Sequence, residues 1–597
     1  MTWIPPQPVL AADAEAQPRR ELFSTLTRID GWGPGAWQEI YCNWHLSCGL
    51  LAVNDRAGED EEDADGSVSL VLILPGQTVL PQHLARDEAA VVAVADWVLR
   101  QVSGSLGRSS AGKKGVRWRT FSPGATVRAT NACWFEPASQ REAPVLFLHL
   151  HVWLPLAGMC CDGLRFARFL RKLEAFARRL SAPGRRPDCA AHIYSVRRQR
   201  ALREALPRYG LVAFLGRGAL LARAADGSPL PACAPLKVPR RHAVTVDLGS
   251  FGRVHGLGIR RGVTAVAGAP YHGKSTVLAA LAAGREDHPP GDGREIVVSE
   301  ATVLRVQAED GRLIKCSDLS WFFPRLPGVS ATDFSTRHAS GATSMAASVV
   351  QGMAAGCRLL LIDEDSAAGN FLHLDPGMRA LLGNDLAGHR TLVEALPALT
   401  QRGVSTVLVA GAHLASLSVA DRILVMRHFQ PQDGTTQARK ILRRRGLNVG
   451  AGATPIMPWR QRLIADDPDC LLGPRNFLSV DTREPERPVI AGVTLDLRRC
   501  GWTLDAALVR GALMAAAWCC RLTEGAPMDL AGLERLYAEL ISQNGLRAID
   551  PFDTALMSAP PWLLVATVLE RLPRPWMRDA AKGVGNHPDQ RASRYLC

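Results

Sequence analysis

The 597-residue sequence lacks the cysteine patterns of metal-binding and disulfide-rich proteins. Its 14 cysteines include no CxxC pair and no spacing typical of zinc ligands, and four of them form the adjacent pairs Cys160-Cys161 and Cys519-Cys520. Adjacent cysteines suit a disulfide framework poorly, so we expect reduced thiols in an intracellular protein. The first 20 residues contain prolines and acidic residues but no apolar segment typical of a secretory signal. We therefore expect a cytoplasmic location, and an organellar one stays open.

The sequence also lacks an apolar run long enough to cross a membrane. Its most apolar stretch, Val145 to Cys161, is interrupted by His149, His151 and Pro155, whereas a spanning helix needs about 20 apolar residues. We interpret this stretch as a buried strand that enters a turn. The two histidines and the cysteine pair could be imagined as metal ligands, but a buried strand accounts for them without a metal. We expect a soluble protein without a membrane span.

The overall composition excludes a disordered or fibrous chain. Apolar residues make up 47% and charged residues 21%, as in ordinary globular proteins. The length predicts two to four domains. The formal net charge is +13, which favours a polyanionic partner such as a nucleic acid, an anionic membrane surface or a nucleotide.

The most informative segment is the glycine-rich stretch 268–276, which matches the phosphate-loop pattern GxxxxGK[ST]. It follows an apolar segment, 263–267, and precedes an Ala/Leu-rich one, 277–283, so we predict a strand, a loop and a helix. Backbone N–H groups of such a loop bind the phosphates of ATP, Lys274 reaches the β and γ phosphates, and Ser275 ligates Mg²⁺. The alternative is a glycine turn with an exposed lysine. The expected nucleotide-binding residues are Gly268, Tyr271, His272, Gly273, Lys274, Ser275 and Thr276.

A second segment, Leu359 to Asp365, runs from four apolar residues into three carboxylates. A buried parallel strand has this pattern, and its carboxyl end is where an α/β sheet places its chemistry. We expect Asp363 to hold Mg²⁺ beside the Lys274 loop and Glu364 to orient and deprotonate the attacking water. An acidic strand end is often merely solvated, but this one lies 89 residues after Lys274, which makes the pair specific.

Between these segments, Ser340 and Gly341 precede a helical pattern, and Ser340 lies 23 residues before Asp363. At that spacing the chain resembles the ATP-binding cassette class, in which a signature serine and glycine cap the γ-phosphate bound by another copy of the domain. An ordinary serine N-cap is the alternative. The sequence holds one phosphate loop and one signature, so the resemblance implies a homodimer with two composite sites.

A closer resemblance is to the predicted ATPases of the ABC class, and it is dense from about Gly252 to Met426. The chain carries counterparts of the blocks that look alike in that family: Tyr271 to Thr276, Pro290 to Glu295, Ala308 to Arg312, Phe334 to Thr336, Ala339 to Gly341, Ile362 to Asp365, and Asn370-Phe371. The resemblance implies ATP and Mg²⁺ as ligands, and some relatives are linked to RNA.

The chain also departs from these patterns. Ordinary cassettes have a glycine where Tyr271 stands, Ala367-Ala368-Gly369 replaces the family's SAT, and the acidic run Glu59 to Asp65 replaces another family motif. His413 follows a predicted strand, 406–410, where ordinary cassettes keep a histidine that contacts the γ-phosphate. We carry His413 as a candidate catalytic residue, with a partly buried loop histidine as the alternative.

The expected fold class is α/β, with an ABC-type P-loop ATPase core. We divide the chain into an N-terminal α/β domain with a linker (1–236), an ABC-class ATPase domain (237–446) and a mostly helical C-terminal domain (447–597). The segment 166–180 predicts a helix with apolar residues on one side and Arg168, Arg171, Lys172, Arg178 and Arg179 elsewhere. Its cationic face is either solvated or a lining for RNA or DNA.

Two functions of different classes fit these features. The first is an ATP-gated clamp on nucleic acid, with RNA favoured. The second is an assembly or regulatory ATPase that acts on a protein partner through the C-terminal domain. A third possibility, a nucleotide binder that no longer hydrolyses ATP, follows from the altered 367–369 loop.

Overall fold

The computed structural model describes residues 16–47, 49–55, 67–106, 116–136, 144–180, 182, 186–224, 227–230, 233–447, 462–465, 479–523, 528–550, 555–573 and 576–579. The acidic run Glu59 to Asp65 lies outside these residues. The chain divides into two compact units. Unit 1 comprises 1–200, 287–290 and 540–559, and unit 2 comprises 201–286, 291–539 and 560–597. The chain passes from unit 1 to unit 2 within helix α4 (Arg186–Ala205), re-enters unit 1 at 287–290, and does so again within α12 (Leu530–Asn544).

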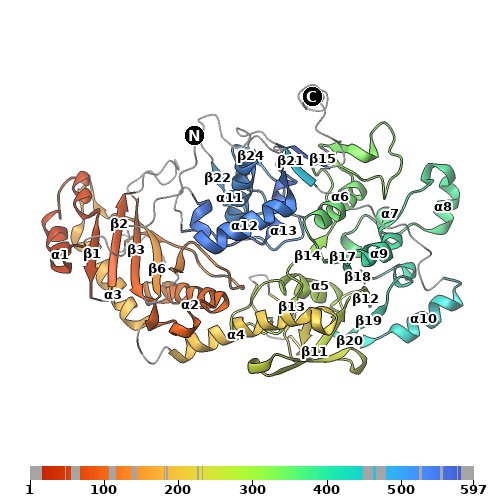
Figure 1. The fold of residues 1–597 in the computed structure, drawn as a ribbon, viewed down its shortest axis with the longest axis horizontal. Coiled ribbons are helices and arrows are strands. Elements are labelled where there is room, and N and C mark those ends of the chain that lie inside the picture. The colour runs from red at the N-terminus through yellow and green to blue at the C-terminus, as the bar shows by residue number, and fades with distance from the viewer. Residues whose placement is uncertain are drawn as a thin grey trace. The chain divides into compact units, whose positions relative to one another are not determined.

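Unit 1 is built on an antiparallel sheet (Figure 1). Its strand order is β1-β2-β3-β6-β4, and β5 also pairs with β6. The predicted strand in the stretch from Val145 is confirmed as β6, in which His149 and His151 are fully buried. The strands are β1 (Asn43–Leu46), β2 (Gly49–Asp55), β3 (Ser67–Pro75), β4 (Trp118–Arg119), β5 (Cys133–Glu136) and β6 (Val145–Trp153), and the hairpin β7 (Leu156–Ala157) and β8 (Cys160–Cys161) follows.

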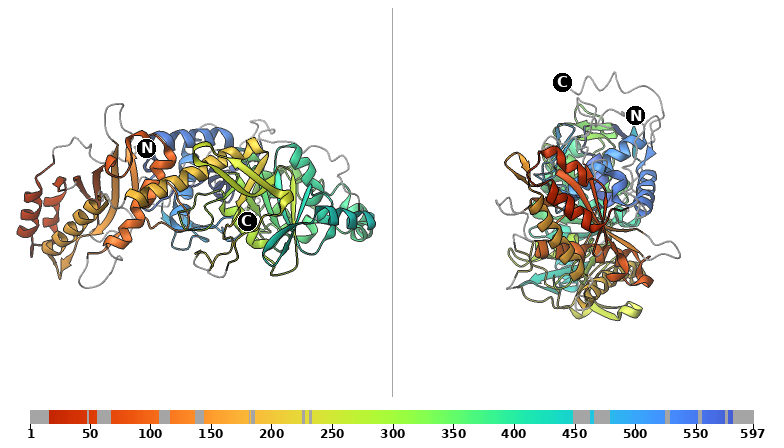
Figure 2. Two further views of the ribbon diagram at one scale, coloured as in Figure 1. Left: turned by 90° about the horizontal axis from the view of Figure 1, so that it is seen from below. Right: turned by 90° about the vertical axis from the view of Figure 1, so that its left-hand side faces the viewer.

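Three helices of unit 1 pack together (Figures 1 and 2): α1 (Arg19–Arg28), α2 (Glu88–Leu106) and α3 (Gly163–Leu180). The predicted amphipathic pattern of 166–180 is confirmed in α3, because its phenylalanines and leucines in that range are buried. The one acidic residue of α3, Glu174, is fully buried, and it accepts hydrogen bonds of 2.6 and 2.8 Å from Arg19 of α1. The charged residues on the exposed face of α3 are therefore all basic.

Unit 2 contains a six-stranded sheet in the order β14-β17-β18-β12-β19-β20, which is parallel except for the last pair. Its strands are β12 (Val263–Ala267), β14 (Val303–Val306), β17 (Leu359–Asp363), β18 (Ser405–Ala410), β19 (Arg422–Arg427) and β20 (Gln430–Asp433). The apolar residues of β17 and β18 are buried on both faces, as in sheets covered by helices on each side. The predicted strands before the phosphate loop, before Asp363 and before His413 are confirmed, and so is the α/β class.

A second sheet of unit 2 is antiparallel, in the order β10-β11-β9-β13. It consists of β9 (Leu211–Gly216), β10 (Ala243–Asp247), β11 (Arg253–Arg260) and β13 (Val297–Ser299). Strand β9 lies before the predicted boundary at residue 236, yet it pairs with β11 and β13 of the predicted ATPase range. The division into three domains otherwise stays a prediction.

Helices cover the parallel sheet and extend beyond it (Figure 1). They are α5 (Lys274–Ala283), α6 (Gly341–Ala354), α7 (Gly369–Leu372), α8 (Pro376–Leu382), α9 (Leu392–Gln401) and α10 (Thr435–Arg444), with the hairpin β15 (Ile314–Ser317) and β16 (Phe334–Thr336). One continuous core joins α5 to both sheets, and it includes Leu278, Leu281, Leu215 and Leu361. The core fixes α5, and therefore the loop before it, relative to the strand ends.

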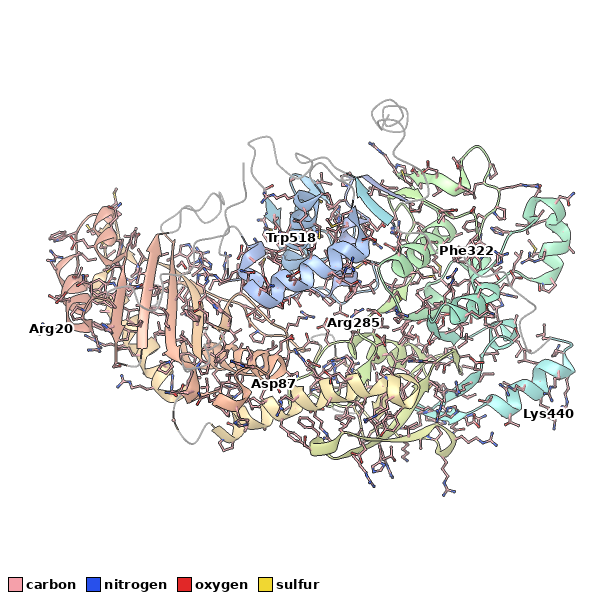
Figure 3. The ribbon with its side chains drawn as sticks, viewed as in Figure 1. Arg20, Asp87, Arg285, Phe322, Lys440 and Trp518 are labelled. Carbon is pink, nitrogen blue, oxygen red and sulfur yellow. The ribbon has the colours of Figure 1, made fainter. Side chains whose placement is uncertain are left out.

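The C-terminal residues of unit 2 contribute α11 (Ala506–Leu522), the start of α12, α13 (Trp562–Leu569) and short strands. These strands are β21 (Arg462–Ala465), β22 (Val480–Asp481), β23 (Val489–Ile490), β24 (Val493–Thr494), β25 (Met528–Asp529) and β26 (Trp576–Asp579). Helix α12 begins at Leu530, because Met528 and Asp529 pair with β21. The Arg285 guanidinium, labelled in Figure 3, lies 3.5 Å from the ring centre of Trp502 and ties this segment to the residues after α5.

Candidate nucleotide-binding site

The phosphate loop joins β12 to α5, as predicted, and two of its glycines are required by close approach. Gly268 has φ 153°, and a Cβ atom there would lie 2.8 Å from the carbonyl oxygen of Met426. Gly273 has φ 92°, and its Cβ would lie 3.0 Å from the Phe429 ring. The loop therefore passes tightly against the turn between β19 and β20. Glycine at both positions leaves the backbone N–H groups free to face a ligand.

Tyr271 adopts a left-handed backbone conformation, with φ 63°, and its side chain is 95% exposed. This conformation is unfavourable for an aromatic residue and is typical of glycine. The position therefore keeps the backbone geometry of the glycine in ordinary cassettes while it presents a ring to solvent. Strain of this kind is concentrated at ligand-binding sites.

The other loop residues divide into buried and open groups. Lys274 is 7% exposed, and its Nζ donates a hydrogen bond of 3.1 Å to the carbonyl oxygen of Ala269. The Lys274 ammonium is thus folded back over the loop and has further donors for phosphate oxygens. Ser275 is exposed and Thr276 half-buried, both in the first turn of α5. His272 accepts a hydrogen bond of 3.0 Å at Nδ1 from the backbone N–H of His428.

Asp363 and Glu364 lie at the carboxyl end of β17, the strand next to β18. Asp363 is 3% exposed, and its Oδ1 accepts a hydrogen bond of 3.3 Å from the N–H of Asp365. Glu364 Oε2 accepts hydrogen bonds from the N–H groups of Gly411 (2.5 Å) and Ala412 (3.1 Å), just after β18. A Cβ atom on Gly411 would lie 3.8 Å from Lys274 Cε and 4.0 Å from Glu364 Oε2. The lysine and the glutamate therefore meet at Gly411.

His413 belongs to the same group of residues. Its Nε2 lies 3.5 Å from Glu364 Oε1, and its side chain is 55% exposed. Its ring lies 5.6 Å from the ring of His373, centre to centre. Burial, and next the neighbouring His413, lowers the pKa of His373. A neutral His373 imposes little charge on the Glu364 side of the site near pH 7.

Ser340 and Gly341 lie on a separate surface. Ser340 is exposed and is the N-cap of α6, where its Oγ accepts a hydrogen bond of 3.3 Å from the N–H of Thr343. The helix start lines a pocket of about 540 Å³, which we call the roof pocket. Among the described residues, the pocket lining includes Ser340, Gly341, Ala367 and Ala368, but none of Lys274, Asp363 and Glu364. In the described part of the chain, the pocket at the signature residues is therefore not lined by the phosphate loop.

Comparison with known proteins identifies the family of the segment that contains the phosphate loop. Residues 185–456, less than half of the chain, match the family model ABC_ATPase, described as a P-loop domain. This segment is an ABC_ATPase P-loop domain. The resemblance seen in the motifs is confirmed for that range.

Other comparisons cover only parts of the chain. Over 189 residues the chain is 31% identical to "Uncharacterized protein MJ1628" of Methanocaldococcus jannaschii, which covers 29% of this chain and 41% of the archaeal protein. The chain thus spans less than half of that relative. Solved structures with partial similarity include cbiO1 of Clostridium perfringens, part of an ABC transporter complex (15% identity, TM-score 0.26, 40% of this chain and 95% of that one). Another is a bacterial Atm1-family ABC exporter (13% identity, TM-score 0.24, 48% and 50%).

Gln307 also lies near the candidate site, although no sequence motif identified it. Gln307 directly follows β14, whose Val306 pairs with Ile362 of β17, so it lies at the same sheet edge as Asp363. Gln307 lines the roof pocket as well. The signal was available, since a polar residue ends the apolar strand 303–306, but β14 is too short to stand out by pattern.

The polar groups of the ABC_ATPase domain fit a magnesium nucleotide. Asp363 is a buried carboxylate that pairs with no cation among the described residues, and Ser275 adds an exposed hydroxyl. No group of three or more His, Cys, Asp or Glu side chains in the described part of the chain could hold a metal by itself. Mg²⁺ is ordinarily held in this way, by one or two carboxylates together with substrate phosphates and water. Within the described ranges, no helix is both long and apolar enough to cross a bilayer.

Proposed function

We propose that this chain hydrolyses ATP to ADP and phosphate at two composite sites formed by a homodimer. The observation that carries the proposal is the meeting of Lys274, Glu364 and the N–H of Gly411 at one sheet edge, beside the buried Asp363 carboxylate. A cation, a metal-binding carboxylate and a candidate base on fixed strand ends are the groups that phosphoryl transfer to water requires.

In the proposed mechanism, backbone N–H groups of the loop and Lys274 bind the β and γ phosphates. Glu364 orients a water molecule and accepts its proton as the water oxygen bonds to the γ-phosphorus. The bond between that phosphorus and the bridging oxygen breaks, and ADP leaves. Ser275 and Asp363 would hold Mg²⁺, which offsets charge on the phosphates. His413, which lies 3.5 Å from Glu364, would contact the γ-phosphate, and Tyr271 and His272 would line the nucleotide as part of the loop.

A second copy would complete each site. Ser340 and Gly341 lie at an exposed helix start, in a pocket that does not include Lys274. The N–H groups of a helix start bind phosphate well, but those of α6 have no phosphate loop in their own pocket. A twofold-related pair of chains would place each roof pocket over the partner's loop. Closure on ATP and release after hydrolysis would then couple the nucleotide state to the distance between the copies.

Exchange of Glu364 for glutamine tests the catalytic assignment. Because the glutamine oxygen can still accept the N–H groups of Gly411 and Ala412, we expect E364Q to fold and bind ATP. Phosphate release should fall about 100- to 10,000-fold, and with ATP and Mg²⁺ the mass in solution should correspond to a dimer. The matched control is E484Q, which changes an exposed carboxylate of unit 2. Full turnover by E364Q, or a monomer with ATP, would overturn the proposal.

For the cargo, we infer that the dimer is an ATP-gated clamp on nucleic acid, with RNA favoured. The net charge of +13 and the exposed cations of α3 support this: Arg168, Arg171, Lys172, Arg178 and Arg179. Among the described residues, none of the five forms an ion pair with a carboxylate. Unpaired cations on one helix face are suited to phosphate contacts, which make affinity depend steeply on salt.

The clamp is tested with E364Q, ATP and labelled single-stranded RNA. We expect an affinity that falls steeply between 50 and 200 mM salt, and a lower affinity for R178A/R179A on α3 than for the control R443A/R444A on α10. An affinity that does not change with salt or with the α3 substitutions would exclude the clamp. Co-purification of one stoichiometric protein without nucleic acid would instead favour the alternative, an assembly or regulatory ATPase that acts on a protein partner.

A further inference from the structure

The roof pocket is lined by one basic side chain that does not belong to the nucleotide-binding motifs. Arg499, from the segment between β24 and α11, lines the pocket together with Ser340, Gly341, Asp310 and Asp365. It is the only Lys, Arg or His residue among the described lining residues. The two acidic residues give the rest of the pocket a negative charge, and Asp310 Oδ1 would lie 3.2 Å from a Cβ atom on Gly341. A phosphate entering beside Ser340 would therefore meet two carboxylates and one guanidinium.

The position of Arg499 is fixed by the residues that follow it. Cys500 is 3% exposed, and Gly501 has φ 84°. A Cβ atom on Gly501 would lie 2.1 Å from the carbonyl oxygen of Arg305 in β14, so only glycine permits this approach. Trp502 is 9% exposed beneath the Arg285 guanidinium. The segment is thus packed onto β14, which precedes Gln307. This packing restricts the position of the Arg499 backbone.

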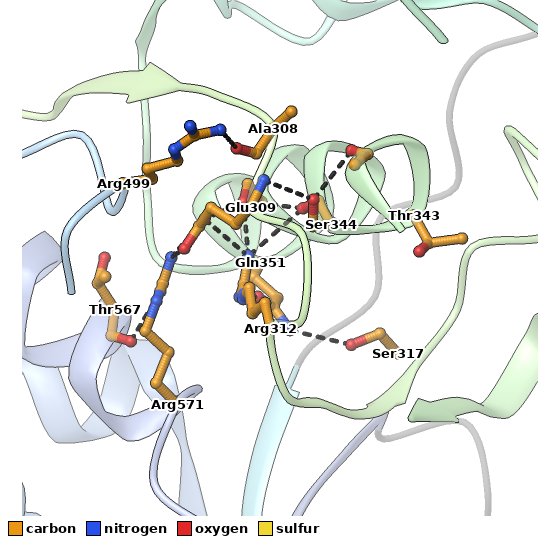
Figure 4. A network of polar contacts seen from close by, with 12 residues as sticks. Ala308, Glu309, Arg312, Ser317, Thr343, Ser344, Gln351, Arg499, Thr567 and Arg571 are labelled. Atoms are coloured by element: carbon orange, nitrogen blue, oxygen red, sulfur yellow. Dashed lines mark hydrogen bonds and ion pairs between the residues drawn. The ribbon is translucent and has the colours of Figure 1, made fainter. Parts of the chain in front are cut away.

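The guanidinium of Arg499 has unused hydrogen-bonding capacity. Its Nη1 donates a hydrogen bond of 3.1 Å to the carbonyl oxygen of Ala308 (Figure 4). Among the described residues, Arg499 pairs with no carboxylate, whereas the adjacent Arg498 pairs with Asp496. Arginine carries five N–H donors in a planar fork that matches phosphate oxygens. The hydrogen bond to Ala308 therefore orients the Arg499 guanidinium and leaves most of its N–H donors available.

We propose that Arg499 binds the γ-phosphate of the ATP held by the phosphate loop of a second copy, and that it stabilises the charge that develops there during transfer. This rests on the composite site proposed above. Arg499 takes no part in proton transfer, because Glu364 of the copy that holds the ATP accepts the proton of the attacking water. A positive charge supplied across the interface makes hydrolysis depend on closure and offsets the repulsion from Asp310 and Asp365.

Two substitutions separate this role from a purely structural one. R499Q keeps an N–H donor for the Ala308 carbonyl but removes the charge, and R499K keeps the charge. If the charge acts on phosphate, phosphate release by R499Q should fall about 100- to 1,000-fold, with R499K between R499Q and wild type and with melting temperatures unchanged. If Arg499 only anchors Ala308, R499Q and R499K should both keep wild-type rates, and the proposal is overturned. R498Q, which removes the neighbouring charge, is the control and should keep wild-type activity.

Mixed dimers test whether the action is across the interface. We expect K274A and R499Q, each nearly inactive alone, to regain up to half of the wild-type rate per dimer when coexpressed with different tags and purified as the mixed pair. One of the two sites would then have an intact loop from the R499Q copy and an intact arginine from the K274A copy. No gain on mixing would show that Arg499 acts within its own chain. A wild-type protein without ATP-dependent phosphate release would overturn the proposed function itself, whereas an active wild type with an equally active R499Q would overturn this inference alone.

Discussion

In the loop half of the site, which comprises Lys274, Asp363 and Glu364, the polar groups already contact the chain around them. Lys274 donates to Ala269, and Glu364 accepts two backbone N–H groups. In the roof half, which comprises Ser340, Gly341 and Arg499, the groups line a pocket of about 540 Å³, where Ser340 caps α6 and Arg499 donates a hydrogen bond to Ala308. The loop half is therefore held in place by its own sheet, whereas the roof half borders a pocket that the phosphate loop does not line.

The two halves also differ in what supports them. The loop half rests on buried parallel strands, which are apolar and continuous with the main core. The roof half rests on a buried polar network (Figure 4), in which Arg571, just after α13, donates hydrogen bonds of 2.6 and 2.7 Å to both oxygens of Glu309. Arg312 joins this network through Glu309, Ser348 and Gln351. Loss of one partner from this buried network should therefore lower the stability of the fold, whereas loss of Lys274 or Glu364 should mainly slow the reaction.

The largest expected effect on stability follows from substitution of Arg571 by methionine. Arg571 and Glu309 are 8% exposed, and loss of one partner from a buried ion pair costs about 3–5 kcal/mol. Burial alone would lower the pKa of Arg571, but Glu309 holds it above the usual value. Urea unfolding of R571M should give a correspondingly smaller free energy of unfolding.

The double variant E309Q/R571M distinguishes an unpaired buried charge from lost packing. It should recover part of the loss because no uncompensated charge remains. If R571M unfolds at the same urea concentration as wild type, the roof half does not depend on this network.

The next largest effect is expected in the loop half, from exchange of Lys274 for alanine. Without the ammonium, the β and γ phosphates lose a charge-assisted donor that strengthens as transfer proceeds, and kcat/KM should fall about 100- to 1,000-fold. The free energy of unfolding should change little, because the Lys274 ammonium has one backbone partner. Phosphate release and urea unfolding are measured together. K440A, which removes an exposed lysine of α10, should match wild type in both measurements.

The sequence predicted the loop half far better than the roof half. The strands before the phosphate loop and before Asp363 lie within short segments with strong local patterns, and both are confirmed. In the roof half, the helical pattern after Ser340 is confirmed as α6. Arg499 and Arg571 were not predicted as part of any site. Their partners Ala308 and Glu309 lie 191 and 262 positions away, and no local periodicity reports contacts at such separations.

The same limit applies to the start of the second sheet. Residues 225–240 resemble a linker because they are rich in Pro, Ala and Gly, and we placed a boundary at 236. Strand β9, which lies before that boundary, nevertheless pairs with β11, which lies after it. Local composition identifies a loop, but only pairing between distant strands shows that the loop connects parts of one sheet.

A matched pair at Gly411 tests how closely Lys274 and Glu364 must approach. An alanine Cβ would make only ordinary contacts of 3.8–4.0 Å with these side chains, so G411A should keep near-normal activity. The branched side chain of G411V would extend between them, and a displacement of about 1 Å can cost about 100-fold in rate. Phosphate release should therefore fall about 10- to 100-fold in G411V alone. Equal activity of the two variants would mean that the approach of these groups is not needed.

A smaller effect is expected from two substitutions of Ser340 that both keep the helix cap. Asparagine and aspartate serve as N-caps about as well as serine, so S340N and S340D should fold like wild type. Only aspartate adds a negative charge to a pocket that is proposed to receive phosphate. ATP-dependent dimerisation, measured by sedimentation, should weaken about tenfold in S340D relative to S340N, which corresponds to about 1.4 kcal/mol. Equal dimerisation would argue against phosphate binding at the roof.

The smallest effect concerns the end of β20, at the sheet edge opposite the phosphate loop. Burial would raise the pKa of Asp433, but hydrogen bonds from Thr435 and His242 lower it from 3.8 to about 2. A carboxylate with a depressed pKa stabilises the fold above its unfolded pKa, and that contribution is lost as the pH falls through the folded value. The free energy of unfolding should therefore decline from about pH 4 towards pH 2, and this decline should be shallower in D433N. D385N, which changes an exposed carboxylate, should keep the wild-type slope, and a D433N slope equal to wild type would show that Asp433 does not contribute to acid sensitivity.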